Sequence, residues 1–505
     1  MKFTSRHLLS ELHGSAGALF GVILFVILFS GCWSLGQDAL QRWAGSLLLS
    51  GQGESLPLER LLERARDRGI KLDGVSLVLP ADKESGVTFC EAHQDCQTLD
   101  PVTGQPLIDA PALNVLMMLH KSAFSGFPGR VLISLFGIVL LILCVAGLLL
   151  HSRRWRDLWR WRRDRGLHRS MFDLHSLIGI WIFPWLLLFA VTGALSGLGA
   201  LGTLLLSPVA YLDKPRQAFA DLLGPPPPAA LGQPLERGVD LDWLLDREAL
   251  RNPNFTAQRL KLNHWGDQAA TVEVSGIHRS LPSTPIFERR LYQLSDGALI
   301  SERSSVDHGV WTRSFIAIQP LHFADYQWLG REWGAWLRAL HLVMGLAACL
   351  LCASGLYLWG QHRSACGRWD TILLPRVAEG VCGGLVLASA LLLLSLQLLP
   401  PALRAGNLPA WLFWVAWGGS QLTALALPRG TRALPLLLSL SGLICLLAAS
   451  LHLYTVRRLD AWPSGATDLF LFVFGVFLCR PMWWLARNVE SRRHSDSCHS
   501  GGRHA

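Results

Sequence analysis

Histidines near the ends of long apolar segments are the residues of this chain best suited to chemistry. An ionisable side chain is costly inside a membrane and usually faces the interior of a helix bundle. His13 and His175 each precede a glycine by four residues, so the imidazole and a small notch share one helix face. Neutral imidazole is a good axial ligand of haem iron, and a flat macrocycle can lie against such a notch. Two such histidines from two helices would predict a bis-histidine haem.

An internal repeat makes these two histidines equivalent. The repeated unit is a helix, a polar domain and a second helix, and duplication without inversion implies an approximate two-fold axis along the membrane normal. We therefore expect His13 and His175 to face each other across that axis. A shift of about 162 residues aligns His13, Gly17 and Gly31 with His175, Gly179 and Gly193, and a shift of about 208 aligns Arg130, Gly137, Cys144 and Gly147 with Arg338, Gly345, Cys352 and Gly355.

A second pair, His120 and His322, precedes the second and fourth helices of the repeat. Two stacked pairs would place two haems across the bilayer, as a path for electrons. His341 begins a third His-xxx-Gly pattern and could replace His322 or line the same site. His168 lies seven residues before His175 on a similar helix face and could replace it.

Simpler interpretations compete with the haem prediction. A single histidine at a helix end is usually satisfied by a carbonyl or by water. A divalent metal site would need Asp, Glu or Cys beside the imidazoles, and these are scarce at such depths. The tail from His494 to His504 could bind metal, although a solvated tail is favoured. No nucleotide-binding loop and no Ser/His/Asp or Cys/His constellation is found.

Composition places these histidines in a multi-pass membrane protein. Of the 505 residues 51% are apolar and 16% charged, which does not suit one large soluble domain. Apolar runs long enough to cross ~30 Å of hydrocarbon recur, often flanked by tryptophans. The net charge of +9 lies mostly in short loops between them, so no nucleic-acid partner is expected. The predicted spans are 15–36, 130–151, 174–206, 333–360, 374–399, 408–427, 432–455 and 467–487.

The loop after the second span sets the predicted orientation. Residues 152–170 contain eight arginines against two aspartates, so this basic loop and both termini are expected in the cytoplasm of a bacterium, with the helices in its inner membrane. The loop could also dock an acidic redox partner or anionic lipid, but topology anchoring is favoured. The first apolar run could be a signal peptide, or a lipobox at Phe29–Cys32; a retained helix is preferred.

The predicted fold is an all-α membrane bundle of about eight helices with two small periplasmic α+β domains. Cys90 and Cys96 share a polar segment and are expected to form a disulfide if it is periplasmic; two free thiols are the alternative. The expected boundaries are helix 1–36, domain 37–129, helix 130–151, basic loop 152–173, helix 174–206, domain 207–332, helix 333–360, a four-helix module 374–487 and a cytoplasmic tail 488–505.

The order of these patterns resembles the PepSY-associated transmembrane proteins over about residues 5–365. The resemblance rests on Leu12-His13-xxx-Gly17, on Phe172-Asp-Leu-His175-Ser-Leu-Ile-Gly179 and on His120 with Gly126-Phe-Pro-Gly-Arg130, and the turns at 100–104 and 295–297 look like the end of a PepSY module. The family includes iron-regulated reductases of ferric siderophores and members with two bis-histidine b haems. The helices after residue 370 and His341 depart from its four-helix members.

The resemblance implies a membrane oxidoreductase with two b haems. Electrons would come from a cytoplasmic donor or a quinol and reduce a ferric chelate, such as a siderophore, in the periplasm. One alternative is a non-enzymatic PepSY protein that binds a periplasmic protein or peptide. Another, a transporter, would need a polar path that the last four helices hardly offer.

Overall fold

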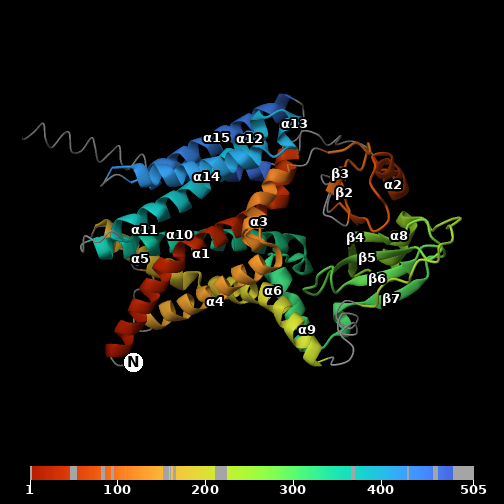
Figure 1. Ribbon diagram of the computed structural model, residues 1–505, viewed down its shortest axis with the longest axis horizontal. Coiled ribbons are helices and arrows are strands. Elements are labelled where there is room, and N and C mark those ends of the chain that lie inside the picture. Colours follow the sequence, from red (N-terminus) through yellow and green to blue (C-terminus); the bar gives the residue numbers. More distant parts are fainter. Residues whose placement is uncertain are drawn as a thin grey trace, which may run out of the picture.

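The computed structural model consists of a core of long helices, a second group of helices packed against it, and one β-sheet (Figure 1). The described residues are 3–45, 54–80, 86–91, 96–107, 110–151, 159, 161–162, 166–210, 224–364, 370–428, 432–458 and 465–480. The sheet lies at one end of the helices, and we call that end the sheet end. The N-terminus lies at the opposite end, which we call the N-terminal end.

Two pairs of long helices form the core. Helix α1 (Phe3–Gly45) packs along α10 (Arg331–Ser364), and α4 (Gly126–His151) packs along α6 (Phe183–Ala210). The repeat relates α1 to α6 and α4 to α10, so the two contacts are equivalent. Two short helices at the sheet end are also equivalent, α3 (Asn114–Ser122) against α1 and α9 (Val310–His322) against α6. The arrangement agrees with the predicted approximate two-fold axis.

The third predicted span, 174–206, was wrong as a single helix. The structure divides it into α5 (Leu167–Trp181) and α6, with Ile182 between them. Pro184 has no backbone N–H and disfavours helical conformation in the residue before it, which explains a break here. His175 therefore lies on the short helix α5 and not on the membrane-spanning helix. The first helix is also longer than the predicted 15–36, and takes in the start of the predicted first domain.

The polar segments form a seven-stranded antiparallel sheet of order β3-β2-β1-β4-β5-β6-β7. The first segment contributes β1 (Ser76–Val78), β2 (Val87–Cys90) and β3 (Cys96–Leu99). The second contributes β4 (Phe255–Asn263), β5 (Thr271–His278), β6 (Arg289–Gln293) and β7 (Leu299–Arg303). Helices α2 (Leu58–Asp67) and α8 (Leu241–Arg251) supply apolar side chains to the same core as the strands.

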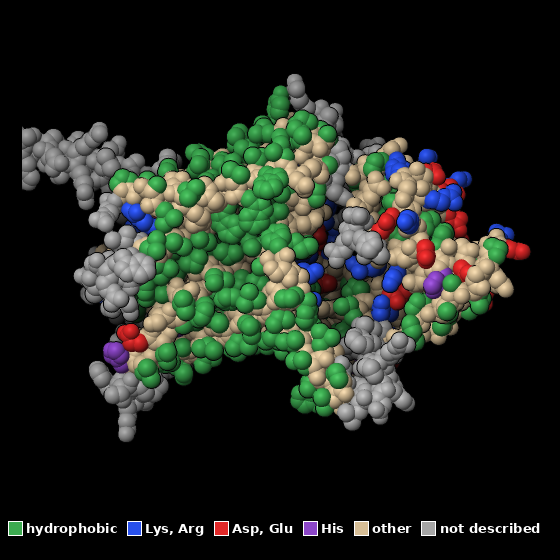
Figure 2. Space-filling model, viewed as in Figure 1, with side chains coloured by type: hydrophobic (Ala, Val, Ile, Leu, Met, Phe, Trp, Pro, Cys, Tyr) green, Lys and Arg blue, Asp and Glu red, His purple; other side chains and the backbone are tan. Residues whose placement is uncertain are grey.

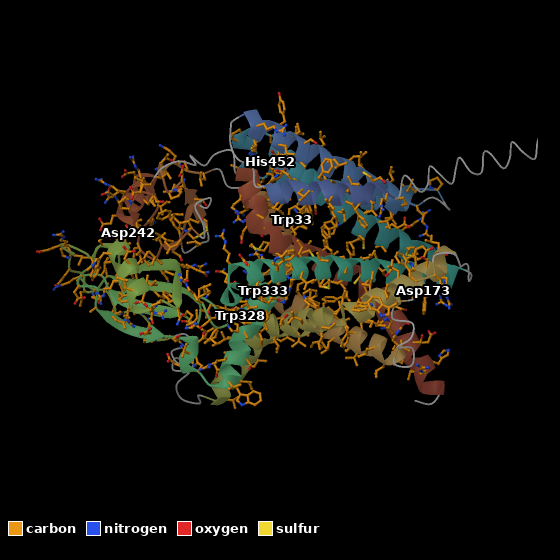
Figure 3. The ribbon with its side chains drawn as sticks, turned by 180° about the vertical axis from the view of Figure 1, so that it is seen from behind. Trp33, Asp173, Asp242, Trp328, Trp333 and His452 are labelled. Atoms are coloured by element: carbon orange, nitrogen blue, oxygen red, sulfur yellow. A yellow bond between two sulfur atoms is a disulfide. The ribbon has the colours of Figure 1, made fainter. Side chains whose placement is uncertain are left out.

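The two predicted domains are joined edge to edge and do not stand apart. Strands β1 and β4 are repeat equivalents, and they pair with each other with Leu77 opposite Leu260. An edge strand exposes unpaired N–H and C=O groups, and pairing of equivalent edges satisfies both. Asp242 adds a second link, because its carboxylate accepts a 2.7 Å hydrogen bond from the Leu58 N–H at the start of α2 (Figure 3).

The chain after residue 370 forms a further helical module. It contains α11 (Asp370–Ala378), the π-helical η5 (Glu379–Gly383), α12 (Gly384–Leu398), α13 (Pro401–Arg404), α14 (Leu408–Ala426), α15 (Leu434–Arg458) and a helix over 465–480. Six helices of the described chain are long and apolar enough to cross a membrane, including 373–398 and 434–457. The other two predicted spans correspond to α14 and 465–480, so the count of eight stays a prediction.

The surface agrees with a multi-pass membrane protein. On the face shown in Figure 2 the helices present almost only hydrophobic side chains, whereas Lys, Arg, Asp and Glu gather over the sheet. Trp33, Trp328 and Trp333 lie where the helices meet the sheet (Figure 3). Tryptophan is enriched at membrane–water interfaces, which is consistent with a membrane surface at this junction.

Candidate functional site

The structure brings His13 and His175 together near the N-terminal end. Their ring centroids are 6.4 Å apart, with an interplanar angle of 72°. His13 comes from α1 and His175 from α5, which packs against α10. We call these two residues the inner pair.

His120 and His322 form the equivalent outer pair at the sheet end. Their ring centroids are 5.9 Å apart and the rings are nearly parallel, at 16°. His120 is on α3 and His322 is the last residue of α9. A left-handed alanine follows each histidine: Ala123 caps α3, and Ala324 comes directly after Phe323, the cap of α9.

The separation within each pair suits two ligands of one metal ion. Bonds from imidazole nitrogen to a metal are about 2 Å long, so rings on opposite sides of one ion have centroids roughly 6 Å apart. His13 and Gly31, which contacts His120, are both on α1, and about 27 Å of helix separates them. The two pairs therefore lie near opposite faces of a bilayer core of ~30 Å.

Hydrogen bonds fix the orientation of three of the four rings. Nδ1 of His120 donates to the Ile27 carbonyl at 2.8 Å, and Nδ1 of His175 donates to the Leu351 carbonyl at 3.1 Å. Nδ1 of His322 is 2.9 Å from the Thr192 hydroxyl, which donates its own hydrogen to the Leu188 carbonyl. These partners place the proton on Nδ1 and leave Nε2 in the form that binds metal. Nδ1 of His13 is buried, and the backbone acceptor beside it is the Leu143 carbonyl, the repeat equivalent of Leu351.

Each paired ring also lies against a glycine of a neighbouring helix. A Cβ added at Gly31 would be 2.8 Å from Cε1 of His120, and at Gly193 it would be 3.5 Å from Cε1 of His322. The equivalent distances at the inner pair are 3.3 Å from Gly147 to His13 and 3.0 Å from Gly355 to His175. The sequence revealed these glycines only as repeat positions, and their role as ring contacts was missed.

Neither alternative ligand joins a pair. His341 is 2% exposed and its Nδ1 lies 3.1 Å from the Tyr326 hydroxyl, while its ring packs edge-on against Phe189. It has no histidine equivalent in the first repeat. His168 lies in the first turn of α5 and is exposed. The structure thus joins the four symmetric histidines in two ring pairs. His341 lies close enough to interact electrostatically with His322 but has no ring contact with it, and His168 is exposed.

The donor set suits the iron of a porphyrin. Among the described residues, no group of three or more His, Cys, Asp or Glu is arranged to hold a metal ion. A porphyrin supplies four nitrogens itself and needs only two axial ligands, which a histidine pair provides. Beside the inner pair no described atom lies within 4 Å of a Cβ built on Gly17, so the notch four residues after His13 is open.

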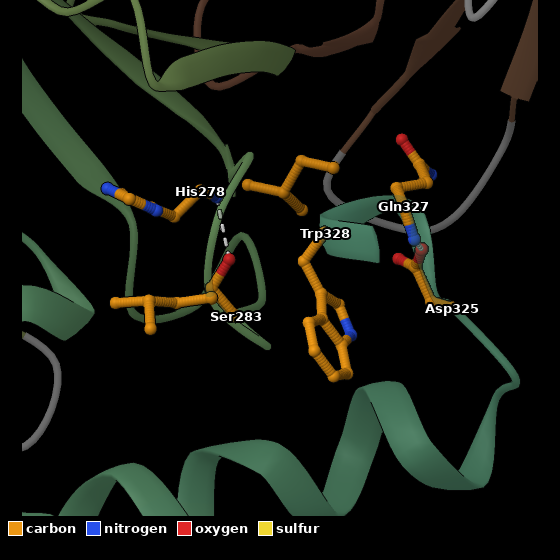
Figure 4. Close-up of a pocket in the computed structure, with 7 residues that line it drawn as sticks. His278, Ser283, Asp325, Gln327 and Trp328 are labelled. Carbon is orange, nitrogen blue, oxygen red and sulfur yellow. Dashed lines mark hydrogen bonds between the residues drawn. The ribbon is translucent and has the colours of Figure 1, made fainter. Parts of the chain in front are cut away.

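A small pocket lies between the sheet and the turn η4 (Gln327–Leu329), soon after His322 in the chain (Figure 4). Its lining includes His278, whose backbone N–H donates to the Ser283 hydroxyl at 2.7 Å, and Trp328, whose indole N–H is buried without a partner. Burial raises the pKa of Asp325, another lining residue. Polar groups therefore line a pocket at the turn that soon follows His322.

Two further predicted features can be located. Cys90 and Cys96 are joined by a disulfide across β2 and β3. Most of the basic loop, and the histidines of the C-terminal tail, lie outside the described residues. Arg162 of the loop is described, and it binds Asp173 of α5 through both its backbone and its guanidinium (Figure 3). These contacts hold the pKa of Asp173 below its usual range.

Comparison with known proteins gives two matches. The family described as PepSY-associated TM region matches residues 10–362. The uncharacterized protein PA4219 of Pseudomonas aeruginosa is 58% identical over 384 residues, which cover 76% of this chain and 98% of that protein. The family match includes all four paired histidines.

Proposed function

Because the chain belongs to the PepSY-associated transmembrane family, we propose that it is a di-haem b oxidoreductase of the bacterial inner membrane that reduces a periplasmic ferric chelate. The observation that carries the proposal is the pairing of four symmetric histidines at the two ends of the helical core. Bound haem would supply a one-electron Fe(III)/Fe(II) couple at each pair.

The proposed orientation places the N-terminal end in the cytoplasm and the sheet in the periplasm. The arginines of residues 152–170 favour the cytoplasmic side for their loop. The Cys90–Cys96 disulfide supports an oxidising compartment for the sheet, since disulfides persist outside the cytoplasm. A cytoplasmic donor or a membrane quinol would deliver electrons toward the inner pair.

The residues of this chain have separate proposed roles. His13 and His175 hold one iron, His120 and His322 hold the other, and the Nδ1 acceptors orient the rings. The sheet and the turn η4, which soon follows His322 in the chain, offer the chelate a polar surface. The chelate would be a ferric siderophore or similar complex. Fe(II) binds hard oxygen ligands far less tightly than Fe(III), so reduction would release the iron.

Electron transfer to a chelate tests this function directly. Purified protein would be reduced anaerobically and mixed with a ferric hydroxamate in the presence of a ferrous-specific dye. We expect the reduced b-type absorption band to disappear while the ferrous dye complex forms. The His120→Ala variant should lose this reaction, and the matched His264→Ala variant should keep it, because His264 directly follows β4 and does not line the pocket. A colourless protein, or reduced haem that ferric chelates do not oxidise, would contradict the proposal.

A further inference from the structure

Three arginines bind the core helices close to the paired histidines. Arg338 donates to the Leu35 carbonyl of α1 at 2.8 Å, and Arg130 donates to the Ser196 carbonyl of α6 at 2.8 Å. Arg130 and Arg338 are repeat equivalents on α4 and α10. At the N-terminal end, Arg6 donates to the Leu150 carbonyl of α4 at 3.2 Å.

Each arginine contact lies about one helical turn from a glycine that touches a paired histidine. Leu35 follows Gly31, the glycine against His120, by four residues, and Ser196 follows Gly193, the glycine against His322, by three. At ~1.5 Å per residue both carbonyls are about 4.5–6 Å nearer the sheet end than the rings. Leu150 is likewise displaced from Gly147, but toward the N-terminal end.

The arginines therefore stand on the outward side of each histidine pair, between it and the nearer membrane face. Arg130 lies close enough to His322 for the two side chains to interact electrostatically. The Arg338 side chain is 45% exposed; Asp38 approaches it at 3.8 Å and Asp325 interacts with it electrostatically. Its five N–H donors exceed these contacts, so the guanidinium retains donors for an anion. Guanidinium binds carboxylate groups strongly because its N–H donors match their geometry.

A haem held by two axial histidines presents two propionate carboxylates along one edge. We propose that Arg130 and Arg338 bind the propionates of the outer haem, one from each side of the two-fold axis, and that Arg6 binds a propionate of the inner haem. The inference rests on the proposed function, because it needs haem at both pairs. These arginine contacts would set the orientation of each macrocycle, with its carboxylates toward the nearer membrane face.

The test compares haem b with its dimethyl ester, which lacks the carboxylate charges. Full-length apoprotein would be titrated by absorbance in the His13→Ala background, where only the outer site binds. There, Arg130→Gln or Arg338→Gln should each weaken haem binding about tenfold or more. The ester should bind weakly and respond to neither substitution. Arg130→Lys or Arg338→Lys should recover part of the haem affinity, because the lysine ammonium keeps the positive charge but lacks the planar set of guanidinium N–H donors.

The inner site provides the reciprocal experiment. In the His120→Ala background, Arg6→Gln should weaken haem binding while Arg130→Gln leaves it unchanged. Arg376→Gln is the matched control, since Arg376 also binds two helix-end carbonyls, those of Leu425 and Leu427, but in the appended module. In both backgrounds, the Arg376→Gln variant should bind haem with the same affinity as the protein in which Arg376 is intact.

Two results would overturn the inference. One is that the protein with its arginines intact binds haem and the dimethyl ester with equal affinity, or that the Arg→Gln variants keep full haem affinity. The other is unchanged haem affinity with a raised KM for ferric citrate but not for an uncharged ferric hydroxamate, which would assign the arginines to carboxylates of the substrate. If the wild-type protein binds no haem, the proposed function itself fails, and that outcome is distinct from haem binding that ignores the arginines.

Discussion

The paired histidines depend on the absence of a side chain at the glycine that each ring contacts. Gly31, Gly147, Gly193 and Gly355 come from four different helices, and each leaves room for an imidazole of another helix. A helical glycine usually costs about 0.5–1 kcal/mol relative to alanine. At Gly31 and Gly355 an added Cβ would lie 2.8 Å and 3.0 Å from the ring, so the same substitution should act in the opposite direction there.

Substitution of Gly31 tests this point. The added Cβ of Gly31→Ala would stand 2.8 Å from Cε1 of His120, which forces the ring to move. We expect the outer haem to be lost or its affinity reduced at least tenfold, with the inner haem retained. Gly36→Ala on the same helix is the control, because nothing lies within 4 Å of its Cβ position. Equal haem retention in both variants would argue against a ring contact at Gly31.

Asp173 provides a pH-dependent prediction outside the membrane-spanning helices. Arg162 lowers the pKa of this carboxyl, so the folded state favours the charged form. The stabilisation is fully present above the usual Asp pKa of about 4, and is lost as pH falls through the lowered value. Asp173→Asn should therefore cost roughly 1–3 kcal/mol near neutral pH. Thermal unfolding should show the difference between variant and wild type closing in acid; a constant difference would contradict the assignment.

At the scale of residues, the sequence could predict which histidines pair but not what orients their rings. The pairs followed from the repeat, because a two-fold axis brings equivalent positions together. The acceptors for His120 and His175 are backbone carbonyls of Ile27 and Leu351. Every residue has a carbonyl, so nothing in the side-chain pattern distinguishes these two. The sequence favoured His120 and His322 over His341 only because His120 and His322 are repeat equivalents and His341 has no histidine equivalent.

Among the helices, the least expected feature is the way the appended module attaches to α1. Trp43, near the sheet end of α1, is fully buried, and its indole N–H donates to Asp468 at 2.8 Å. His452 of α15 contacts the same carboxylate through Nδ1 at 2.9 Å (Figure 3). The centroids of the His452 and Trp43 rings are 4.8 Å apart. An indole, an imidazole and a carboxylate from three helices thus meet in an apolar interior.

Removing the carboxylate should loosen this attachment. Asp468→Ala leaves the buried Trp43 N–H and the His452 imidazole without their shared acceptor, which typically costs about 3–5 kcal/mol for a buried charged pair. We expect a clearly lower unfolding temperature in detergent, with helices α3 and α9, which carry the outer pair, unaffected. Asp38→Ala removes a carboxylate that is 75% exposed and should change little. Similar unfolding temperatures for the two variants would contradict a structural role for Asp468.

Element boundaries were predicted well where hydrophobic pattern alone decides them. The spans predicted at 130–151 and 333–360 correspond to α4 and α10, with ends that agree to within about four residues. The break at Ile182 was missed because the residues on both sides are apolar, and a continuous hydrophobic run does not show where one helix ends and the next begins. The pairing of β1 with β4 was missed because the residues of an edge strand do not indicate which other strand it will pair with.

For the whole molecule, the repeat explains how one chain builds two similar sites. Each repeat gives a histidine to the inner pair and one to the outer pair, and a strand to the central β1–β4 contact. Neither repeat can complete a site or close its sheet alone. The appended module packs on α1 of the first repeat and on α10 of the second, and it has no described counterpart beside α4 and α6, which breaks this symmetry (Figure 1).

The most direct test of the account is the haem content of the purified full-length protein after haem-replete expression. We predict a reducible b-type spectrum with two haems per wild-type chain. One haem should remain in His13→Ala or His175→Ala, and the other in His120→Ala or His322→Ala. His168→Ala and His341→Ala should keep both. A wild-type protein without a b-type spectrum, or two haems in every variant, would contradict the assignment of the four paired histidines as ligands.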